Sequence, residues 1–287
     1  MHNAALAALG REDPTWADWR YFRFDVPPED LPRALALLHA KRFRGVNLTV
    51  PHKVLAFDQM AEVDDDARPV GAVNTLKWTA RGWHGFNTDG YGLSAALRAT
   101  LGCELAGQSV LLLGAGGAAR GAAIECLRRG CSALTVCNRT SAHLEVLLEL
   151  LRPLAGKTRI HGMNLPTPPR QIHFSVSGAS GNPFVKESTP GKPSIIIINA
   201  TSAGLRPDDP VPLDLTSIAT AAAVYDMIYN PPLTALLRQA KSLGMPHANG
   251  LSMLVHQGAK ALEIWTGVPA ARTAPVMQAA AEAAART

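Results

Sequence analysis

Residues 109–120 read SVLLLGAGGAAR, and this stretch decides the fold of the chain. Its first five residues form a short apolar run that is typical of a strand buried in a parallel sheet. Glycines follow at positions 114, 116 and 117, and residues 121–127 (GAAIECL) predict a helix. A glycine-rich turn between a strand and a helix is the context that a dinucleotide-binding fingerprint requires.

Each small residue of this turn has a physical role in such a site. Gly114 permits the tight turn, Gly116 lets the backbone approach a pyrophosphate, and Ala119 allows close helix packing where a third glycine often stands. The helix that follows offers free N–H groups and the positive end of its dipole to phosphates. The candidate cofactor-binding residues here are Gly114, Ala115, Gly116, Gly117 and Ala118.

The second predicted strand, residues 133–137, ends at Asn138, Arg139 and Thr140. Enzymes that use NAD usually carry an acidic residue at this distance after the turn, where it binds the ribose 2′-hydroxyl. Arg139 can instead pair with a 2′-phosphate, which indicates NADP(H) rather than NAD(H). The alternative is an ordinary surface arginine beside a purely structural turn. The combination of turn, flanking elements and basic strand end favours the cofactor.

Composition sets further bounds. The chain has 287 residues, 47% of them hydrophobic and 18% charged, which suits two modest globular domains. The net charge of +5 is scattered over short groups such as residues 41–44, which argues against a nucleic-acid partner. The four cysteines lack metal-ligand spacing, so we expect no metal and a reducing, cytoplasmic location. Neither a signal peptide nor a membrane-spanning run stands out, so we expect no membrane partner.

Alternating strand and helix patterns predict an α/β fold with a doubly wound parallel sheet. Strands are predicted at residues 45–50, 72–78, 83–87, 109–113, 133–137, 195–200 and 223–227. Helices are predicted at residues 31–38, 121–127, 233–243, 253–266 and 274–285, with another beginning at Tyr91. The segment 158–193 is rich in proline, glycine and serine, which predicts a long surface loop with a strand at residues 172–176.

Two polar clusters offer the proton donor that a reductase needs. The first is residues 47–53 (NLTVPHK), where Pro51 stops a strand and projects Lys53 near its end. The second is residues 85–90 (GFNTDG), which places Asp89 just before the dinucleotide-binding unit. A lysine and an aspartate that converge at a cleft can serve as acid and orienting group. An ordinary salt bridge between them is the alternative interpretation, and His52 is interpreted as a structural residue.

The chain resembles the shikimate dehydrogenase family over nearly its whole length. The resemblance rests on the order and spacing of eight short motifs, at residues 45–53, 71–75, 87–90, 114–118, 138–140, 199–204, 226–229 and 250–257. It implies an NADP-dependent enzyme that reversibly reduces 3-dehydroshikimate to shikimate, on the route to chorismate and aromatic amino acids. It also implies a substrate-binding α/β domain (residues 1–89 and 250–287) and a Rossmann NADP-binding domain (residues 90–249). The C-terminal helices would return to the substrate domain, and the two domains would close on the substrate.

The resemblance also implies roles for matched residues. Lys53 is the acid and base, and Asp89 is its partner. The substrate-binding residues are Thr49, Asn74, Tyr229 and Gln257. The nicotinamide site is lined by Thr201, Met227 and Gly250, and the 2′-phosphate is bound by Asn138, Arg139 and Thr140. Taken alone, Thr49 and Asn74 are equally consistent with strand-end caps, Gln257 with a surface position and Met227 with the core.

The sequence departs from the family pattern in two places. Members of the family begin with a strand and a Ser-x-Ser-Pro segment that binds the substrate carboxylate, whereas this sequence begins at Met1, directly before the matching His2 and Asn3. We expect that the start was assigned at an internal methionine. His143 stands where a second arginine often follows Arg139, which predicts a weaker, pH-dependent phosphate site.

Alternatives remain at this stage. One is a quinate or aminoshikimate dehydrogenase, since the sequence does not decide the substrate pocket. Another is an inactive NADPH-binding fragment that lacks the N-terminal serines. The oligomeric state, monomer or homodimer, also stays open.

Overall fold

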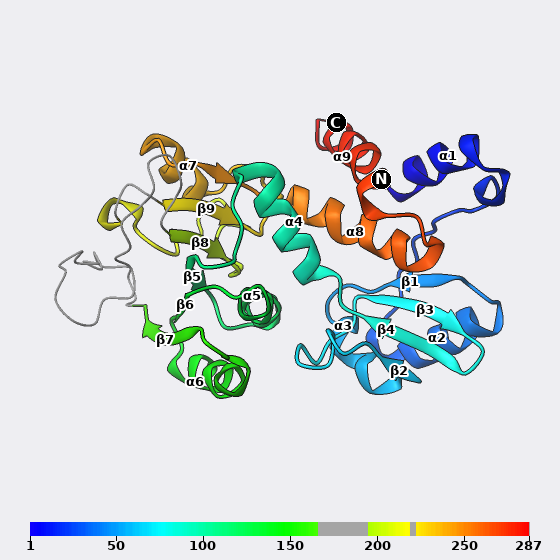
Figure 1. The fold of residues 1–287 in the computed structure, drawn as a ribbon, viewed down its shortest axis with the longest axis horizontal. Coiled ribbons are helices and arrows are strands. Elements are labelled where there is room, and N and C mark those ends of the chain that lie inside the picture. The colour runs from blue at the N-terminus through cyan, green and yellow to red at the C-terminus, as the bar shows by residue number, and fades with distance from the viewer. Residues whose placement is uncertain (166–194, 219–221, 287) are drawn as a thin grey trace. The chain divides into compact units, whose positions relative to one another are not determined.

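The computed structural model describes residues 1–165, 195–218 and 222–286. The chain divides into two compact units, residues 1–92 with 254–287 (unit 1) and residues 93–253 (unit 2). The chain passes from one unit to the other inside two helices, α4 (Asp89–Leu101) and α8 (Leu251–Thr266), which Figure 1 labels.

Unit 1 contains a four-stranded sheet in the order β1-β3-β4-β2. Its strands are β1 (Gly45–Asn47), β2 (Glu62–Val63), β3 (Thr75–Thr79) and β4 (Gly82–Phe86). β3 and β4 form the antiparallel hairpin expected from the turn at residues 81–82, whereas β2 joins β4 in parallel. Leu31 and Leu35 of α2 (Leu31–Ala40) pack with Leu76 and Trp83 of the hairpin, which gives this sheet its core.

The C-terminal helices belong to unit 1, which confirms that they return to the N-terminal part of the chain. A second core joins α1 (His2–Glu12), α8 and α9 (Ala270–Ala285) through small and aliphatic side chains. Trp265 of α8 reaches the sheet, where its Nε1 donates to the Leu76 carbonyl at 2.9 Å. Gly45 makes room for this ring, because a Cβ there would lie 2.0 Å from the Trp265 Nε1 atom.

Unit 2 is built on a six-stranded parallel sheet in the order β10-β9-β8-β5-β6-β7. The strands are β5 (Ser109–Leu113), β6 (Ala133–Asn138), β7 (Arg159–Asn164), β8 (Ile195–Asn199), β9 (Ala222–Asp226) and β10 (His247–Ala248). This order is that of a doubly wound Rossmann fold, as predicted, and the winding direction reverses between β5 and β8. Ligands of such sheets bind outside the carboxyl ends of the strands at that reversal.

Helices connect these strands. In unit 2 they are α5 (Gly117–Arg128), α6 (Ser141–Leu151) and α7 (Ala235–Ser242). A short helix, α3 (His52–Leu55), belongs to unit 1. Five single turns of 3-10 helix complete the described elements: η1 (Pro14–Trp16), η2 (Pro28–Asp30), η3 (Phe57–Gln59), η4 (Arg152–Leu154) and η5 (Leu215–Ser217). All four cysteines are free and buried.

Several predicted boundaries were wrong, among them the starts of β3, at Thr75 instead of residue 72, and of α9, at Ala270 instead of residue 274. The strand predicted at residues 45–50 ends at Asn47, and Lys53 lies in a helix rather than at a strand end. Helix α5 begins at Gly117 instead of residue 121, so the second half of the glycine-rich stretch is already helical. Residues 159–164 form the edge strand β7 inside a segment predicted as loop. The strand predicted at residues 172–176 lies outside the described residues.

Candidate active site

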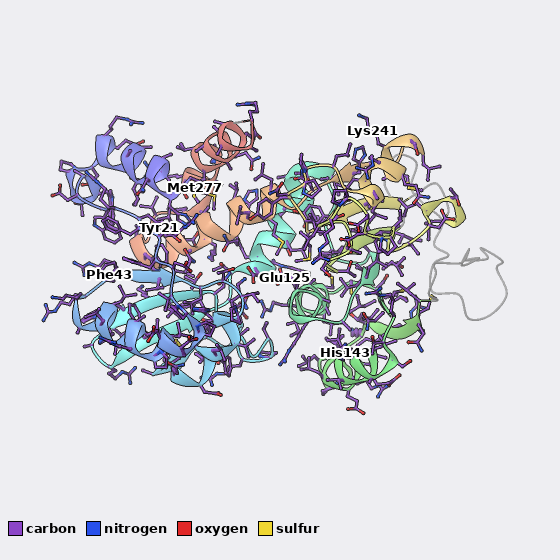
Figure 2. The ribbon with its side chains drawn as sticks, turned by 180° about the vertical axis from the view of Figure 1, so that it is seen from behind. Tyr21, Phe43, Glu125, His143, Lys241 and Met277 are labelled. Atoms are coloured by element: carbon purple, nitrogen blue, oxygen red, sulfur yellow. The ribbon has the colours of Figure 1, made fainter. Side chains whose placement is uncertain are left out.

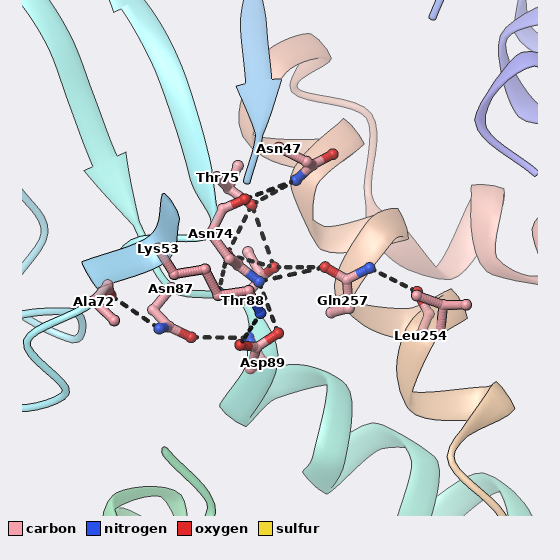
Figure 3. Close-up of polar contacts among 10 residues, drawn as sticks. All are labelled: Asn47, Lys53, Ala72, Asn74, Thr75, Asn87, Thr88, Asp89, Leu254 and Gln257. Atoms are coloured by element: carbon pink, nitrogen blue, oxygen red, sulfur yellow. Dashed lines mark hydrogen bonds and ion pairs between the residues drawn. The ribbon is translucent and has the colours of Figure 1, made fainter. Parts of the chain in front are cut away.

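An ion pair between Lys53 and Asp89 is the centre of a polar cluster in unit 1 (Figure 3). The Lys53 Nζ atom lies 2.7 Å from the Asp89 Oδ2 atom, and the two side chains are 24% and 26% exposed. Both groups are therefore largely enclosed, yet solvent or a ligand can still reach them.

Local backbone contacts explain how residues 36 positions apart meet. Lys53 follows the exposed turn that holds Thr49, and its backbone carbonyl accepts from Val73 N at 2.9 Å. Asn87 ties the segment before α4 to the same region, because its Nδ2 donates to the Ala72 carbonyl at 2.9 Å. The Asn87 Oδ1 atom then accepts from Asp89 N at 3.1 Å, an Asx turn that starts α4 and orients Asp89.

Asn74 joins the ion pair to the rest of the cluster, and its side chain is 1% exposed. Its Nδ2 atom donates to Asp89 Oδ1 at 2.8 Å and to Gln257 Oε1 at 3.3 Å. Its Oδ1 atom accepts from the backbone N–H of Thr88 at 2.9 Å. The amide therefore has a fixed orientation, and Asp89 presents one oxygen to Asn74 and the other to Lys53.

Gln257 enters the cluster from α8, which is distant in sequence but belongs to the same unit. Its Nε2 atom donates to the Leu254 carbonyl at 2.8 Å, so its Oε1 atom faces Asn74. Figure 3 shows Asn74 between Asp89 and Gln257. Gln257 is thus a partly buried member of a polar cluster and not the surface residue that its apolar neighbours suggest.

A second layer of polar residues supports Asn74. Thr75 and Thr88 are buried, and the Oγ1 atom of Thr75 donates to Asn74 Oδ1 at 2.9 Å. The Nδ2 atom of Asn47 donates to Thr75 Oγ1 at 2.9 Å, and Tyr21 donates its hydroxyl to Asn47 Oδ1 at 3.1 Å. Burial raises the pKa of the Tyr21 phenol, which keeps it a proton donor.

Sequence reasoning assigned no site role to Thr75, Thr88 or Tyr21. Each threonine lies inside a quoted motif, and the available signal was a small polar residue next to a motif asparagine or aspartate. Tyr21 had no such signal, since its partner Asn47 is 26 residues away. Among the expected substrate-binding residues, Thr49 lies in the exposed turn before α3, and Tyr229 belongs to unit 2, where it is 47% exposed.

In unit 2, the carboxyl ends of β5 and β8 meet at the glycine-rich turn. Gly114 has a φ of +110°, a conformation that favours glycine. A Cβ on Gly114 would lie 3.1 Å from the Ala200 carbonyl oxygen and 3.1 Å from the Thr201 Cγ2 atom. Gly114 and Thr201 are therefore neighbours at the point where the winding of the sheet reverses.

Gly116 and Gly117 have no such neighbours. A Cβ at either position would meet nothing within 4 Å, and Gly116 has an ordinary φ of −84°. Packing within the chain therefore does not require these two glycines. They sit at the exposed start of α5, where first-turn N–H groups point outward, and this open backbone fits the close approach of a pyrophosphate. Ala115 lies in the turn, Ala118 is exposed in the first turn of α5, and Ala119 is fully buried.

The remaining expected cofactor residues lie at the same edge of the sheet. Asn138 ends β6 and donates from Nδ2 to the Thr140 carbonyl at 2.9 Å, which leaves Arg139 exposed between them. His143 is exposed on α6 (Figure 2). Gly250 packs directly against Met227, because a Cβ there would lie 2.1 Å from the Met227 carbonyl oxygen. An exposed arginine and an open glycine turn fit a phosphorylated dinucleotide.

Within the described residues, no group of three or more His, Cys, Asp or Glu side chains is arranged to hold a metal ion. No helix in this part of the chain has the length and apolarity needed to cross a membrane.

Comparisons with known proteins identify the family of this chain. Residues 1–76 match the family model described as the shikimate dehydrogenase substrate binding domain, and residues 250–282 match that of the shikimate 5′-dehydrogenase C-terminal domain. A curated relative, the shikimate dehydrogenase (NADP(+)) of Citrifermentans bemidjiense, is 39% identical over 93% of this chain and 84% of its own length.

Two solved structures cover nearly the whole chain. One is the shikimate 5-dehydrogenase of Thermus thermophilus in complex with NADP(H) and shikimate, with 31% identity, a TM-score of 0.72 and coverage of 96% of this chain and 94% of the other. The other is the 5-ketofructose reductase of a Gluconobacter species, with 32% identity, a TM-score of 0.76 and coverage of 96% and 92%. The identity and coverage shared with the curated relative settle the assignment: this chain belongs to the shikimate dehydrogenase family.

Proposed function

We propose that this protein catalyses the reversible, NADPH-dependent reduction of 3-dehydroshikimate to shikimate. The observation that carries the proposal is the Lys53–Asp89 ion pair, held by Asn74 and Gln257 in a partly open cluster. The curated relative and the Thermus structure supply the substrate and the cofactor by name.

The residues of the cluster have distinct roles in this reaction. NADPH, when bound, supplies a hydride to the carbonyl carbon of the substrate. The Lys53 ammonium donates a proton to the carbonyl oxygen, and the neutral amine takes the hydroxyl proton in the reverse direction. Asp89 holds Lys53 through Oδ2 while Asn74 occupies Oδ1. Lys53 regains its proton from solvent, to which it is 24% exposed.

The substrate hydroxyls would be bound by Asn74, Gln257 and Thr49, with Tyr229 contributing from unit 2. Unit 1 is thus the proposed substrate domain and unit 2 the proposed cofactor domain. The proposed cofactor residues are Gly114, Ala115, Gly116, Gly117, Ala118, Asn138, Arg139, Thr140, Thr201, Met227 and Gly250. Arg139 supports NADP(H) over NAD(H), because an exposed guanidinium can pair with the 2′-phosphate and no acidic residue occupies this strand end.

The first experiment compares the steady-state oxidation of shikimate by wild type and by Lys53→Ala. The absorbance of the NADPH that forms reports the rate. We expect kcat to fall by about 100-fold or more, the usual contribution of a general acid. Lys260→Ala is the matched control, since Lys260 also belongs to unit 1 and also forms a half-buried ion pair, with Glu263. A Lys53→Ala variant with wild-type kcat would overturn the catalytic role of Lys53.

Other substrates test the reaction itself. Two other substrates are assayed beside shikimate. Quinate, which would reduce NADP⁺, is the alternative that the sequence leaves open. 5-Ketofructose, which would oxidise NADPH, is included because the fold is shared with a 5-ketofructose reductase. We expect the highest kcat/KM with shikimate. Turnover of 5-ketofructose or quinate without turnover of shikimate would show that the proposed substrate is wrong. The proposed role of Lys53 would still stand.

A further inference from the structure

Asp226 is a fully buried carboxylate at the carboxyl end of β9, with 0% of its side chain exposed. The ion pairs formed by the described residues do not include it. Burial of an unpaired carboxylate is costly unless hydrogen-bond donors surround it. Burial raises the pKa of Asp226 despite its hydrogen bonds, so burial disfavours its ionised form. A costly group at the edge of a cofactor sheet calls for an explanation other than stability.

Three donors converge on this carboxylate. The Oδ1 atom accepts from Asn199 Nδ2 at 3.0 Å and from Ile228 N at 3.1 Å. The Oδ2 atom accepts from Thr234 Oγ1 at 2.7 Å. Thr234 also caps α7, where its Oγ1 accepts from Leu237 N at 3.3 Å. Asp226 therefore joins the last residue of β8 to the segment after β9.

Asn199 links Asp226 to Thr201 through hydrogen bonds. Because its Nδ2 donates to Asp226, its Oδ1 atom is directed to the next turn, where it accepts from Thr201 Oγ1 at 2.7 Å and from Thr201 N at 3.1 Å. Thr201 Oγ1 in turn accepts from Ala203 N at 3.1 Å. These bonds fix the rotamer of Thr201, whose Cγ2 atom lies against Gly114 at the reversal of the sheet.

We infer that Asp226 is a positioning residue for the cofactor site: through Asn199 it fixes Thr201 beside the glycine-rich turn and so shapes the surface that binds the nicotinamide half of NADP(H). The inference rests on the proposed function for the identity of the cofactor. Met227 lies at the same edge of the parallel sheet, and its backbone N–H donates to the Asn199 carbonyl at 3.0 Å. Thr201 and Met227 are thus both hydrogen-bonded to Asn199, which is itself hydrogen-bonded to Asp226.

The test measures the Kd for NADP⁺ by calorimetry, independently of turnover. Asp226→Ala removes the nearer of the two acceptors of Asn199 Nδ2 and leaves only the Ala203 carbonyl, at 3.3 Å. We expect Kd to rise about tenfold, which corresponds to about 1.4 kcal/mol. Asp226→Asn keeps an oxygen for Asn199 and Ile228 N, so it should bind NADP⁺ nearly as wild type does. The KM for shikimate should change little in either variant. Asp214→Ala is the control, because Asp214 also accepts from three donor atoms, and these come from Thr216 and Gln239.

A double-mutant cycle separates positioning from general loosening of the fold. Thr201→Val removes the hydroxyl through which Asp226 acts, so Asp226→Ala should add little to the Kd in that background. If Asp226→Ala fails to fold by circular dichroism, Asn199→Ser breaks the same link while Asp226 keeps two donors, and it should raise Kd similarly.

Several outcomes would overturn the inference. They are a folded Asp226→Ala with the wild-type Kd, an effect that adds fully to that of Thr201→Val, and a folded Asn199→Ser with unchanged Kd. Failure of the proposed function looks different. In that case wild type does not bind NADP⁺, or it binds NADP⁺ without turning over shikimate.

Discussion

Single glycines distinguish a ligand requirement from a packing requirement. Gly116→Ala introduces a methyl group into open space, so we expect the melting temperature to change little. If a pyrophosphate approaches this backbone, the same methyl group should weaken NADP⁺ binding about tenfold, equivalent to about 1.4 kcal/mol. Calorimetric titration measures the Kd, and thermal denaturation measures the stability.

Gly121 provides the matched control for Gly116. It also has open space around its Cβ position, but it lies inside α5. Gly121→Ala should stabilise the protein by about 0.5–1 kcal/mol, because alanine loses less backbone entropy in a helix, and it should leave the Kd unchanged. Equal binding by wild type and Gly116→Ala would contradict the placement of a pyrophosphate at this turn.

His2 makes stability depend on pH. It is buried and stacks on Tyr21 with 4.1 Å between ring centroids. Burial lowers the pKa of His2 to about 4. In the unfolded chain His2 therefore binds a proton near pH 6.5, whereas in the folded chain it does so only near pH 4. The free energy of unfolding falls as the pH drops from about 6.5 to about 4. The loss should approach roughly 3 kcal/mol, at about 1.4 kcal/mol per pKa unit.

Urea denaturation between pH 7 and pH 4 checks this expectation. His2→Phe keeps an aromatic ring against Tyr21 but cannot titrate, so its stability should fall less than that of wild type over this range. His143→Gln removes an exposed histidine and should follow the wild-type curve. Parallel curves for wild type and His2→Phe would show that His2 does not contribute to the acid sensitivity.

At the scale of elements, β1 and α8 fit together at one crowded point. A Cβ on Gly45 would lie 2.0 Å from Trp265 Nε1 and 2.3 Å from its Cε2 atom. Gly45→Ala should therefore displace the indole, break its bond to Leu76 and destabilise the protein by about 1–3 kcal/mol, as overpacking does. Chemical denaturation measures the loss. Gly45→Ala combined with Trp265→Leu should recover part of it, and no recovery would show that the collision is not the cause.

The same scale shows what the sequence could reveal. Buried parallel strands such as β5 and β8 have continuous apolar runs, so both were predicted nearly to the residue. The edge strand β7 was missed because it pairs on one side only and is mostly exposed, so its sequence lacks that pattern. β1 was predicted too long because its register with β3 ends at Asn47, where the Asn47 side chain and Leu48 N both donate to the Asn74 carbonyl and the exposed turn follows. Strand ends set by such contacts leave no periodic signal.

The polar cluster shows a similar limit. Lys53 and Asp89 stood out as charged residues in turn-rich motifs, and the structure brings them together. The importance of Asn74 came only from the family resemblance, since a buried amide acquires its meaning from partners as distant as Gln257, 183 residues away. Thr75 and Thr88 escaped for the same reason. Local sequence patterns indicate which residues are candidates for catalysis. They say little about the residues that orient those side chains.

For the whole molecule, each unit has a hydrophobic core of its own. We therefore expect differential scanning calorimetry to resolve two transitions. NADP⁺ at about 100 times its Kd should stabilise the transition of unit 2 by about 2.7 kcal/mol, and shikimate should shift the other. A single transition moved by either ligand would show that the two units unfold as one.

The division of the chain also affects its synthesis. Unit 2 is one continuous segment, whereas unit 1 needs residues 254–287, which include Gln257 and Trp265. A ribosome releases the chain from its N-terminus at about 5–20 residues per second, and domains fold as units when their residues emerge. The proposed cofactor domain can therefore be finished on the ribosome while the proposed substrate domain still waits for its last two helices. During that interval, the face of the N-terminal sheet that Trp265 later covers is a surface for chaperones to protect.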